Sequence, residues 1–238
     1  IQQLTPEVMA SDAHLFTPRN AYRIRTMTPL STTYDDPTTG EDPRYGAYLA
    51  YWLKAPAQAA PTVTILDASG KVVRTLRGSN QAGVNRLVWD LEDERSPGAH
   101  LLTAPMYAPH LQPGPEGRSG GGGMSILMPP GTYTVKLTVD GAEQSKPLTV
   151  LKDPNAGGSE AEIGQQMTLL RAIREDMNRA VAMVNRVEGV RAQLATLARF
   201  TDDAEVKAAV AALEAKLVEV EQNLVDLRLT GRGKDGSR

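Results

Sequence analysis

Four acidic residues gather in one short segment, and carboxylates at this density could bind calcium or act as an acid and a base. Asp35, Asp36, Glu41 and Asp42 flank Gly40. Their spacing does not match the EF-hand loop, in which oxygen ligands stand at fixed positions. We therefore interpret the segment as a solvated loop. Glycoside hydrolysis by a pair of these carboxylates remains an alternative, because the two acids of a glycosidase need not be neighbours in the chain.

Aromatic residues form the second group with chemical potential, since flat rings can stack on sugars or fill a protein interface. The segment YGAYLAYWL, residues 45–53, alternates as a strand with apolar residues on both sides. A strand of this kind is usually covered on both faces, and one cover must come from outside the sheet that contains it. We predict that Tyr48 and Trp52 form a binding surface, either a domain interface or a platform for carbohydrate.

Other reaction chemistry finds little support in the sequence. The chain has no Cys, and its three His are far apart, so neither a thiolate nucleophile nor a zinc site is indicated. The glycine run at 120–123 lacks the Gly-Lys-Ser/Thr ending of a phosphate loop, and we interpret it as a flexible part of a long loop over 101–124. No cofactor is expected.

Composition also limits the partners. The net charge of the 238 residues is -2, which does not favour nucleic acid, and no apolar run is long enough to span a membrane. The chain opens on Ile1 without the basic residues of a signal peptide, so we expect a processed protein or part of a longer one.

The elements that must position the aromatic residues are short strands. Period-two alternation runs through PTVTILDASGKVVRTL, through Gly83–Leu91 and through PPGTYTVKLTVDG. The first contains a turn at Ser69-Gly70, and the last ends in Asp140-Gly141, which suits a two-residue hairpin. We predict an antiparallel immunoglobulin-like sandwich in which Tyr133, Val135, Leu137 and Val139 face the opposing sheet.

Helical periodicity follows this β part. Ser159 and Glu162 fit a capping box, and a helix is expected to run to about Arg199. A second capping box is predicted at Asp202 and Glu205. The second helix spaces its apolar residues alternately four and three apart, the seam of a coiled coil: Val206, Val210, Leu213, Leu217, Val220, Leu224 and Leu227. An antiparallel two-helix hairpin buries one stripe only, so we expect it to pack on a third element or on a second copy.

The predicted fold class is therefore α+β, with several domains. The divisions are a segment that leaves an upstream domain, a β-sandwich, a linker, a helical hairpin and a disordered tail, at 1–17, 18–153, 154–158, 159–230 and 231–238.

Six segments in this order carry a resemblance: 12–23 (DAHLFTPRNAYR), 42–54 (DPRYGAYLAYWLK), 65–76, 82–91, 129–141 and 148–154. Together they resemble the C-terminal region of bacterial BNR-repeat, sortilin-like β-propeller proteins, often described as glycosyl hydrolases. The strand block from Ile65 to Val150 also resembles the immunoglobulin-like domain of the flagellar hook-capping protein. The Asp-box pattern of the propeller blades is absent, so no catalytic residue is carried onto this chain.

This resemblance implies a non-catalytic accessory module in a secreted or periplasmic protein, with an upstream β-propeller domain or subunit as its partner. Self-association through the helical hairpin and carbohydrate binding are further expectations. A carbohydrate-binding module and a glycoside hydrolase in its own right are the alternative functions.

Overall fold

The structure is a computed structural model that describes residues 3–24, 44–105, 108, 110, 113–114 and 116–225. It divides into two compact units. The first contains residues 1–94 and 125–169, and the second contains 95–124 and 170–238. The predicted acidic loop with Asp35, Asp36, Glu41 and Asp42 lies outside the described residues, as do Leu227 and the tail at 231–238.

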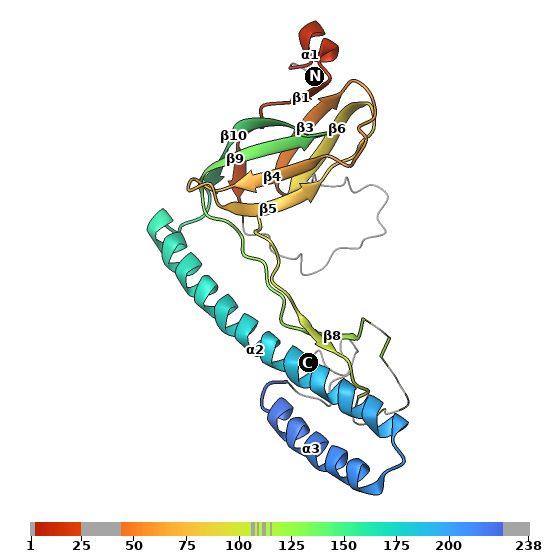
Figure 1. The fold of residues 1–238 in the computed structure, drawn as a ribbon. Helices are drawn as coiled ribbons and strands as arrows, with labels where there is room; N and C mark the ends of the chain where they lie inside the picture. The colour runs from red at the N-terminus through yellow and green to blue at the C-terminus, as the bar shows by residue number, and fades with distance from the viewer. Residues whose placement is uncertain are drawn as a thin grey trace, which may run out of the picture. The chain divides into compact units, whose positions relative to one another are not determined.

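Two sheets build the first unit (Figure 1). The three-stranded sheet is antiparallel, in the order β1 (Ala13–Leu15), β3 (Ala47–Leu53) and β6 (Gly83–Trp89). The five-stranded sheet is mixed, because β2 pairs with β10 in parallel while the other neighbours are antiparallel. Its order is β2 (Ala21–Arg23), β10 (Ala142–Lys152), β9 (Gly131–Val139), β4 (Thr62–Leu66) and β5 (Val72–Arg77). A short helix, α1 (Pro6–Ala10), precedes them.

Period-two alternation places the core of this unit as predicted. Tyr133, Val135, Leu137 and Val139 of β9 are all buried. The turn between β9 and β10 is formed by Asp140 and Gly141, with φ of 46° and 88°. Positive φ at both residues is what a type I′ hairpin requires, which confirms the predicted turn.

Side chains connect the two sheets. The rings of Trp89 in β6 and Tyr133 in β9 meet edge to face, with centroids 5.2 Å apart. Gln144 of β10 accepts a hydrogen bond from the Leu15 amide at 2.8 Å and donates one to the Ala13 carbonyl at 2.9 Å. One amide side chain thus satisfies both backbone groups that β1 turns toward β10.

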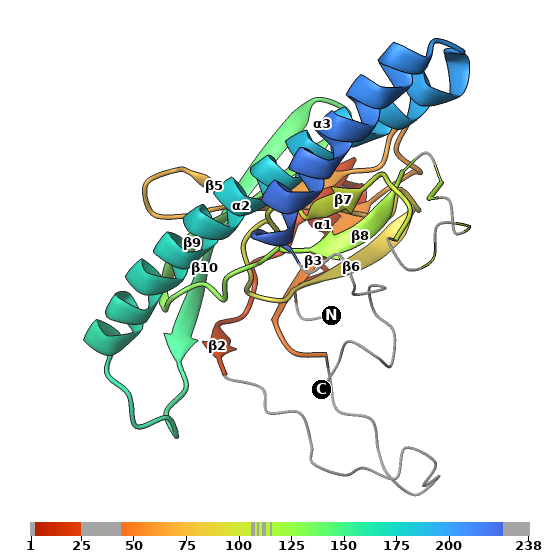
Figure 2. The same cartoon turned by 90° about the horizontal axis from the view of Figure 1, so that it is seen from below.

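The second unit holds two antiparallel helices and a ribbon of two strands (Figure 2). Helix α2 (Glu160–Phe200) starts in the first unit and enters the second at Leu170, and α3 (Ala204–Gln222) follows. The predicted capping box at Ser159 and Glu162 is confirmed by reciprocal hydrogen bonds. At α3 the predicted cap is wrong by one residue. Asp203, and not Asp202, accepts the hydrogen bonds from the backbone amides of the first helical turn.

The ribbon consists of β7 (Ala99–Leu101) and β8 (Arg118–Gly121), so the prediction of a flexible loop over 101–124 is wrong for its last part. Glycine is used here for close packing. A Cβ atom on Gly122 would stand 2.5 Å from a methyl carbon of Val181 in α2, and one on Gly120 would stand 2.9 Å from the Cβ of Ala99. The ribbon is the third element on which the helical hairpin packs, through Ala99, Leu101, Val181 and Val184.

The predicted seam of α3 is wrong at two positions. Val210 is buried, but Leu213 and Val220 are 43% and 53% exposed. Glu214 and Glu221, one residue further along, turn toward α2 instead because Arg191 of α2 lies opposite them. No helix in the described part of the chain is both long and apolar enough for a membrane span.

The rotated seam gives a test of stability. Val210→Lys places a charge in the buried interface and should lower the free energy of unfolding by about 3 kcal/mol or more. Leu213→Lys lies on the exposed side and should change it by less than about 1 kcal/mol. Urea titration followed by circular dichroism measures both changes. A larger loss of stability in Leu213→Lys than in Val210→Lys would support the seam predicted from the sequence instead.

Candidate functional site

The candidate site is the outer face of the three-stranded sheet, the side turned away from the buried core. The inner residues of β3, Ala47, Leu49, Tyr51 and Leu53, are at most 1% exposed. Alternation along the strands therefore turns the other set outward. We define the outer face by the following residues of β1, β3, β6 and the residue after β1: His14, Phe16, Tyr48, Ala50, Trp52, Val84, Arg86 and Val88.

Cross-strand register brings the apolar members together. Tyr48 pairs with Val88, and Trp52 lies between Val84 of β6 and His14 of β1. The His14 and Phe16 rings meet edge to face at 5.3 Å. Tyr48 is 49% exposed and Val84 is 45% exposed, so this apolar surface is open to solvent over part of its area.

The two predicted site residues differ in their surroundings. Tyr48 is exposed, and its hydroxyl donates a hydrogen bond of 2.9 Å to the carbonyl of Arg44, which fixes the ring. Trp52 is half-buried, and its buried indole N–H finds no acceptor among the described residues. Both belong to the outer face, with Ala50 between them on the strand.

A pocket of about 760 Å³ opens on the outer face. Trp52 is not part of its wall. The lining comes from the N-terminal segment, the β1–β2 connection, β3 and β6: Gln3, Leu4, Phe16, Thr17, Pro18, Arg19, Asn20, Gly46, Tyr48, Leu49, Ala50, Val84 and Arg86.

The pocket wall has a definite charge. Among the described residues that line it, Arg19 and Arg86 are the only charged side chains, and none is Asp or Glu. Burial, and then the charge of Lys146, lower the pKa of neighbouring His14, which favours the neutral imidazole. Among the described residues, no group of His, Asp or Glu is placed to hold a metal ion. The chemistry offered by the described lining is stacking and anion contact.

Sequence reasoning missed the pocket residues Phe16, Arg19 and Arg86. The sequence did indicate that Arg86 lies on the outer face, because alternation along β6 places it on the same side as Val84 and Val88. Phe16 and Arg19 carried none, since their place depends on the pairing of β1 with β3. The carboxylates considered for catalysis, Asp35, Asp36, Glu41 and Asp42, lie outside the described residues.

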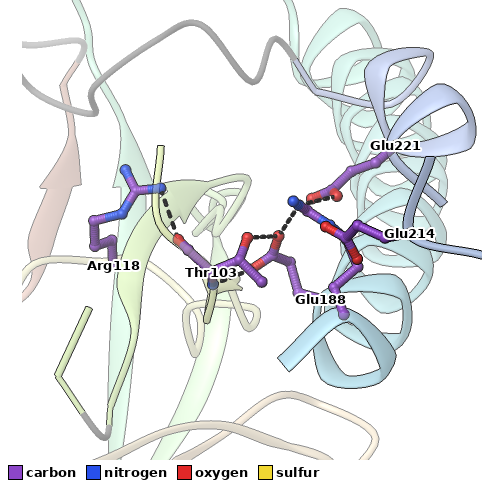
Figure 3. A network of polar contacts seen from close by, with 6 residues as sticks. Thr103, Arg118, Glu188, Glu214 and Glu221 are labelled. Carbon is purple, nitrogen blue, oxygen red and sulfur yellow. Dashed lines mark hydrogen bonds and ion pairs between the residues drawn. The ribbon is translucent and has the colours of Figure 1, made fainter. Parts of the chain in front are cut away.

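A second polar cluster lies inside the helical unit (Figure 3). Arg191 donates to Glu188 at 2.6 Å, to Glu221 at 2.7 Å and to Glu214 at 2.9 Å. The side chains of Glu188 and Glu221 are 1% and 0% exposed. Glu188 also accepts hydrogen bonds from both the backbone amide and the hydroxyl of Thr103. These bonds attach the segment that follows β7 to α2.

Carboxylates outnumber guanidinium groups in this cluster. Three acids surround a single guanidinium, and one oxygen each of Glu214 and Glu221 has no hydrogen-bond partner among the described residues. Burial, followed by the negative charge of Glu188, raises the pKa of Glu221 to about 7. Near neutral pH this cluster therefore takes up a proton that a solvent-exposed glutamate would release.

This shift predicts how stability depends on pH. In the unfolded chain Glu221 titrates near its ordinary 4.5, whereas in the folded protein it titrates near 7. The folded state therefore binds the proton more tightly between these values. The contribution of Glu221 to the free energy of unfolding is therefore fully present below about 4.5 and should fall by about 3 kcal/mol as pH rises through 7.

Urea titrations at about pH 5 and about pH 8 measure this loss. Glu221→Gln cannot ionise and should reduce the loss markedly, while Glu219→Gln, an exposed neighbour on α3, should leave it unchanged. An equal pH dependence in Glu221→Gln and the unmodified protein would exclude Glu221 as its source.

No protein-family model matches the chain, and no curated protein matches its sequence. The resemblance to propeller-associated regions therefore stays a prediction, and function is inferred from the chemistry of the outer face.

Proposed function

We propose that this chain is a non-catalytic accessory module of a secreted or periplasmic protein of carbohydrate metabolism. Its outer face would contact a neighbouring β-propeller domain or subunit, as the resemblance implies. We further propose that the two sheets of the first unit correspond to an immunoglobulin-like sandwich. The observation that carries the proposal is the open apolar surface around Tyr48, Trp52 and Val84.

Physical chemistry favours a contact role for this surface. Contiguous exposed apolar area costs free energy in water, and on soluble proteins it commonly marks an interface. Aromatic residues are enriched in such interfaces, and the outer face presents His14, Phe16, Tyr48 and Trp52 on adjacent strands. The core side of β3 is already covered, so a partner would supply the second cover that its apolar pattern predicts.

Hydrolysis by this chain has no support at the outer face. A glycosidase needs two carboxyl groups on either side of the scissile bond. In the part of the chain that the structure describes, the pocket wall contains neither Asp nor Glu, and its charged groups are both arginines. Stacking and hydrogen bonding could hold a sugar there, but the described lining supplies no carboxylic acid to protonate a leaving group.

Carbohydrate binding is the second candidate function, and the pocket itself favours it. Its volume of about 760 Å³ falls within the range of small-molecule sites. Two aromatic rings, Phe16 and Tyr48, line it beside the amide of Asn20 and the two arginines. This combination of apolar rings with a few polar groups is typical of ligand sites.

Self-association is a further proposal for the helical unit. The hairpin already packs on the ribbon, yet Leu213 and Val220 remain exposed on α3. These residues are the surface through which a second copy would contact the hairpin.

The interface proposal is tested in the protein as it is naturally expressed. Val84→Lys puts a charge into the outer face and should weaken its contact with the neighbouring domain, so limited proteolysis should release the module several-fold faster. Val72→Lys is the matched control, because Val72 is also an exposed strand valine, 55% exposed against 45% for Val84, and lies on the other sheet. Equal release rates for the two variants would contradict docking through the outer face.

A further inference from the structure

The charge of the outer-face pocket points to the class of its ligand. Arg19 reaches the pocket from the β1–β2 connection, and Arg86 reaches it from β6. Neither guanidinium has a hydrogen bond or an ion pair with another residue in the described part of the chain. Two unneutralised cations in one pocket repel each other, and a bound anion would relieve this repulsion.

The strand register leaves room beside Arg86. Its partner on β3 is Ala50, the smallest side chain in the central row of the outer face. Gly46 forms another part of the wall without a side chain, and its backbone demands glycine: φ is +132°, and a Cβ atom would stand 2.1 Å from the Trp89 carbonyl oxygen. Neither Ala50 nor Gly46 therefore fills the part of the wall that it shares with Arg86 and Tyr48.

We propose that this pocket binds a saccharide that carries a carboxylate, with the carboxylate held by Arg19 and Arg86 and the sugar ring stacked on Tyr48. A guanidinium presents paired N–H donors that match the two oxygens of a carboxylate. The apolar side of a sugar ring matches the exposed face of Tyr48, whose hydroxyl is already engaged with the Arg44 carbonyl. The inference rests on the carbohydrate-binding candidate and adds the charge of the ligand.

A simple anion would use only half of this wall. Inorganic phosphate could contact the two arginines, but it would leave Phe16 and Tyr48 exposed to water. A neutral sugar would cover the rings and leave both cations without a counterion. An acidic saccharide satisfies both parts, since it joins a carboxylate to an apolar ring face within one small molecule.

The test compares two saccharides that differ in charge. Trigalacturonic acid and neutral α-1,4-linked galactotriose are titrated into the full chain by calorimetry, at low salt and again at higher salt. We expect the acidic trisaccharide to bind at least about tenfold more tightly, with an affinity that falls as salt rises. Inorganic phosphate is added as a competitor and should displace it only weakly.

Variants assign the residues. Arg86→Gln and Arg19→Gln should each weaken binding of trigalacturonic acid about ten- to a hundredfold. Arg77→Gln is the matched control, because it removes an exposed strand arginine of the other sheet and should change nothing. Tyr48→Ala should weaken both saccharides, and unchanged melting curves show that each variant is folded.

The outcomes separate the two ideas. Equal affinity for both trisaccharides, or no loss in Arg86→Gln, overturns the acidic-ligand inference and leaves carbohydrate binding standing. Efficient displacement by phosphate shows a general anion site and also overturns it. Binding of neither trisaccharide overturns the inference together with the carbohydrate candidate, while the interface proposal is judged by the Val84→Lys result.

Discussion

The alternation of β3 between two neighbouring strands is the constraint on which the candidate site depends. Because successive side chains point to opposite sides of a sheet, the burial of Leu49, Tyr51 and Leu53 forces Tyr48, Ala50 and Trp52 outward. A slip of the register by one residue would exchange the two sets and expose the core. Two contacts hold that register. The ring of Trp89 in β6 packs against Tyr133 of the other sheet, and Gln144 forms hydrogen bonds with β1 at the sheet edge.

The outer face combines two kinds of surface that usually serve recognition. Removing apolar rings from water lowers the free energy. Guanidinium groups select a binding partner by its charge and by the direction of its hydrogen-bond acceptors. The module and carbohydrate-binding proposals differ in what provides the cover, a protein domain or a sugar. Both are consistent with the described lining of the pocket, which combines apolar rings with two arginines and contains no carboxylate.

The helical unit needs an additional packing partner, because two helices alone bury little surface. Here a ribbon with closely packed glycines supplies extra apolar contact, and Glu188 ties the ribbon to α2 through Thr103. The ion cluster at Arg191 carries a cost, because desolvating several charges opposes their attraction. Its geometry fixes the rotation of α3, since the carboxylates of Glu214 and Glu221 must face one guanidinium, and a purely apolar seam allows more than one rotation.

By itself, the sequence determined the local structure of this protein. Strand alternation, the Asp140–Gly141 turn, the Ser159 cap and the α+β class follow from interactions between residues close in the chain, and these are set by spacing and residue type. The outward placement of Tyr48 and Trp52 on one strand face was also readable. Only the tertiary structure placed Phe16, Arg19 and Arg86 around one pocket, because strand pairing across long stretches of chain has no local signal. It also turned Glu214 and Glu221 inward in place of Leu213 and Val220, since a heptad pattern records apolar residues but not the buried arginine opposite them.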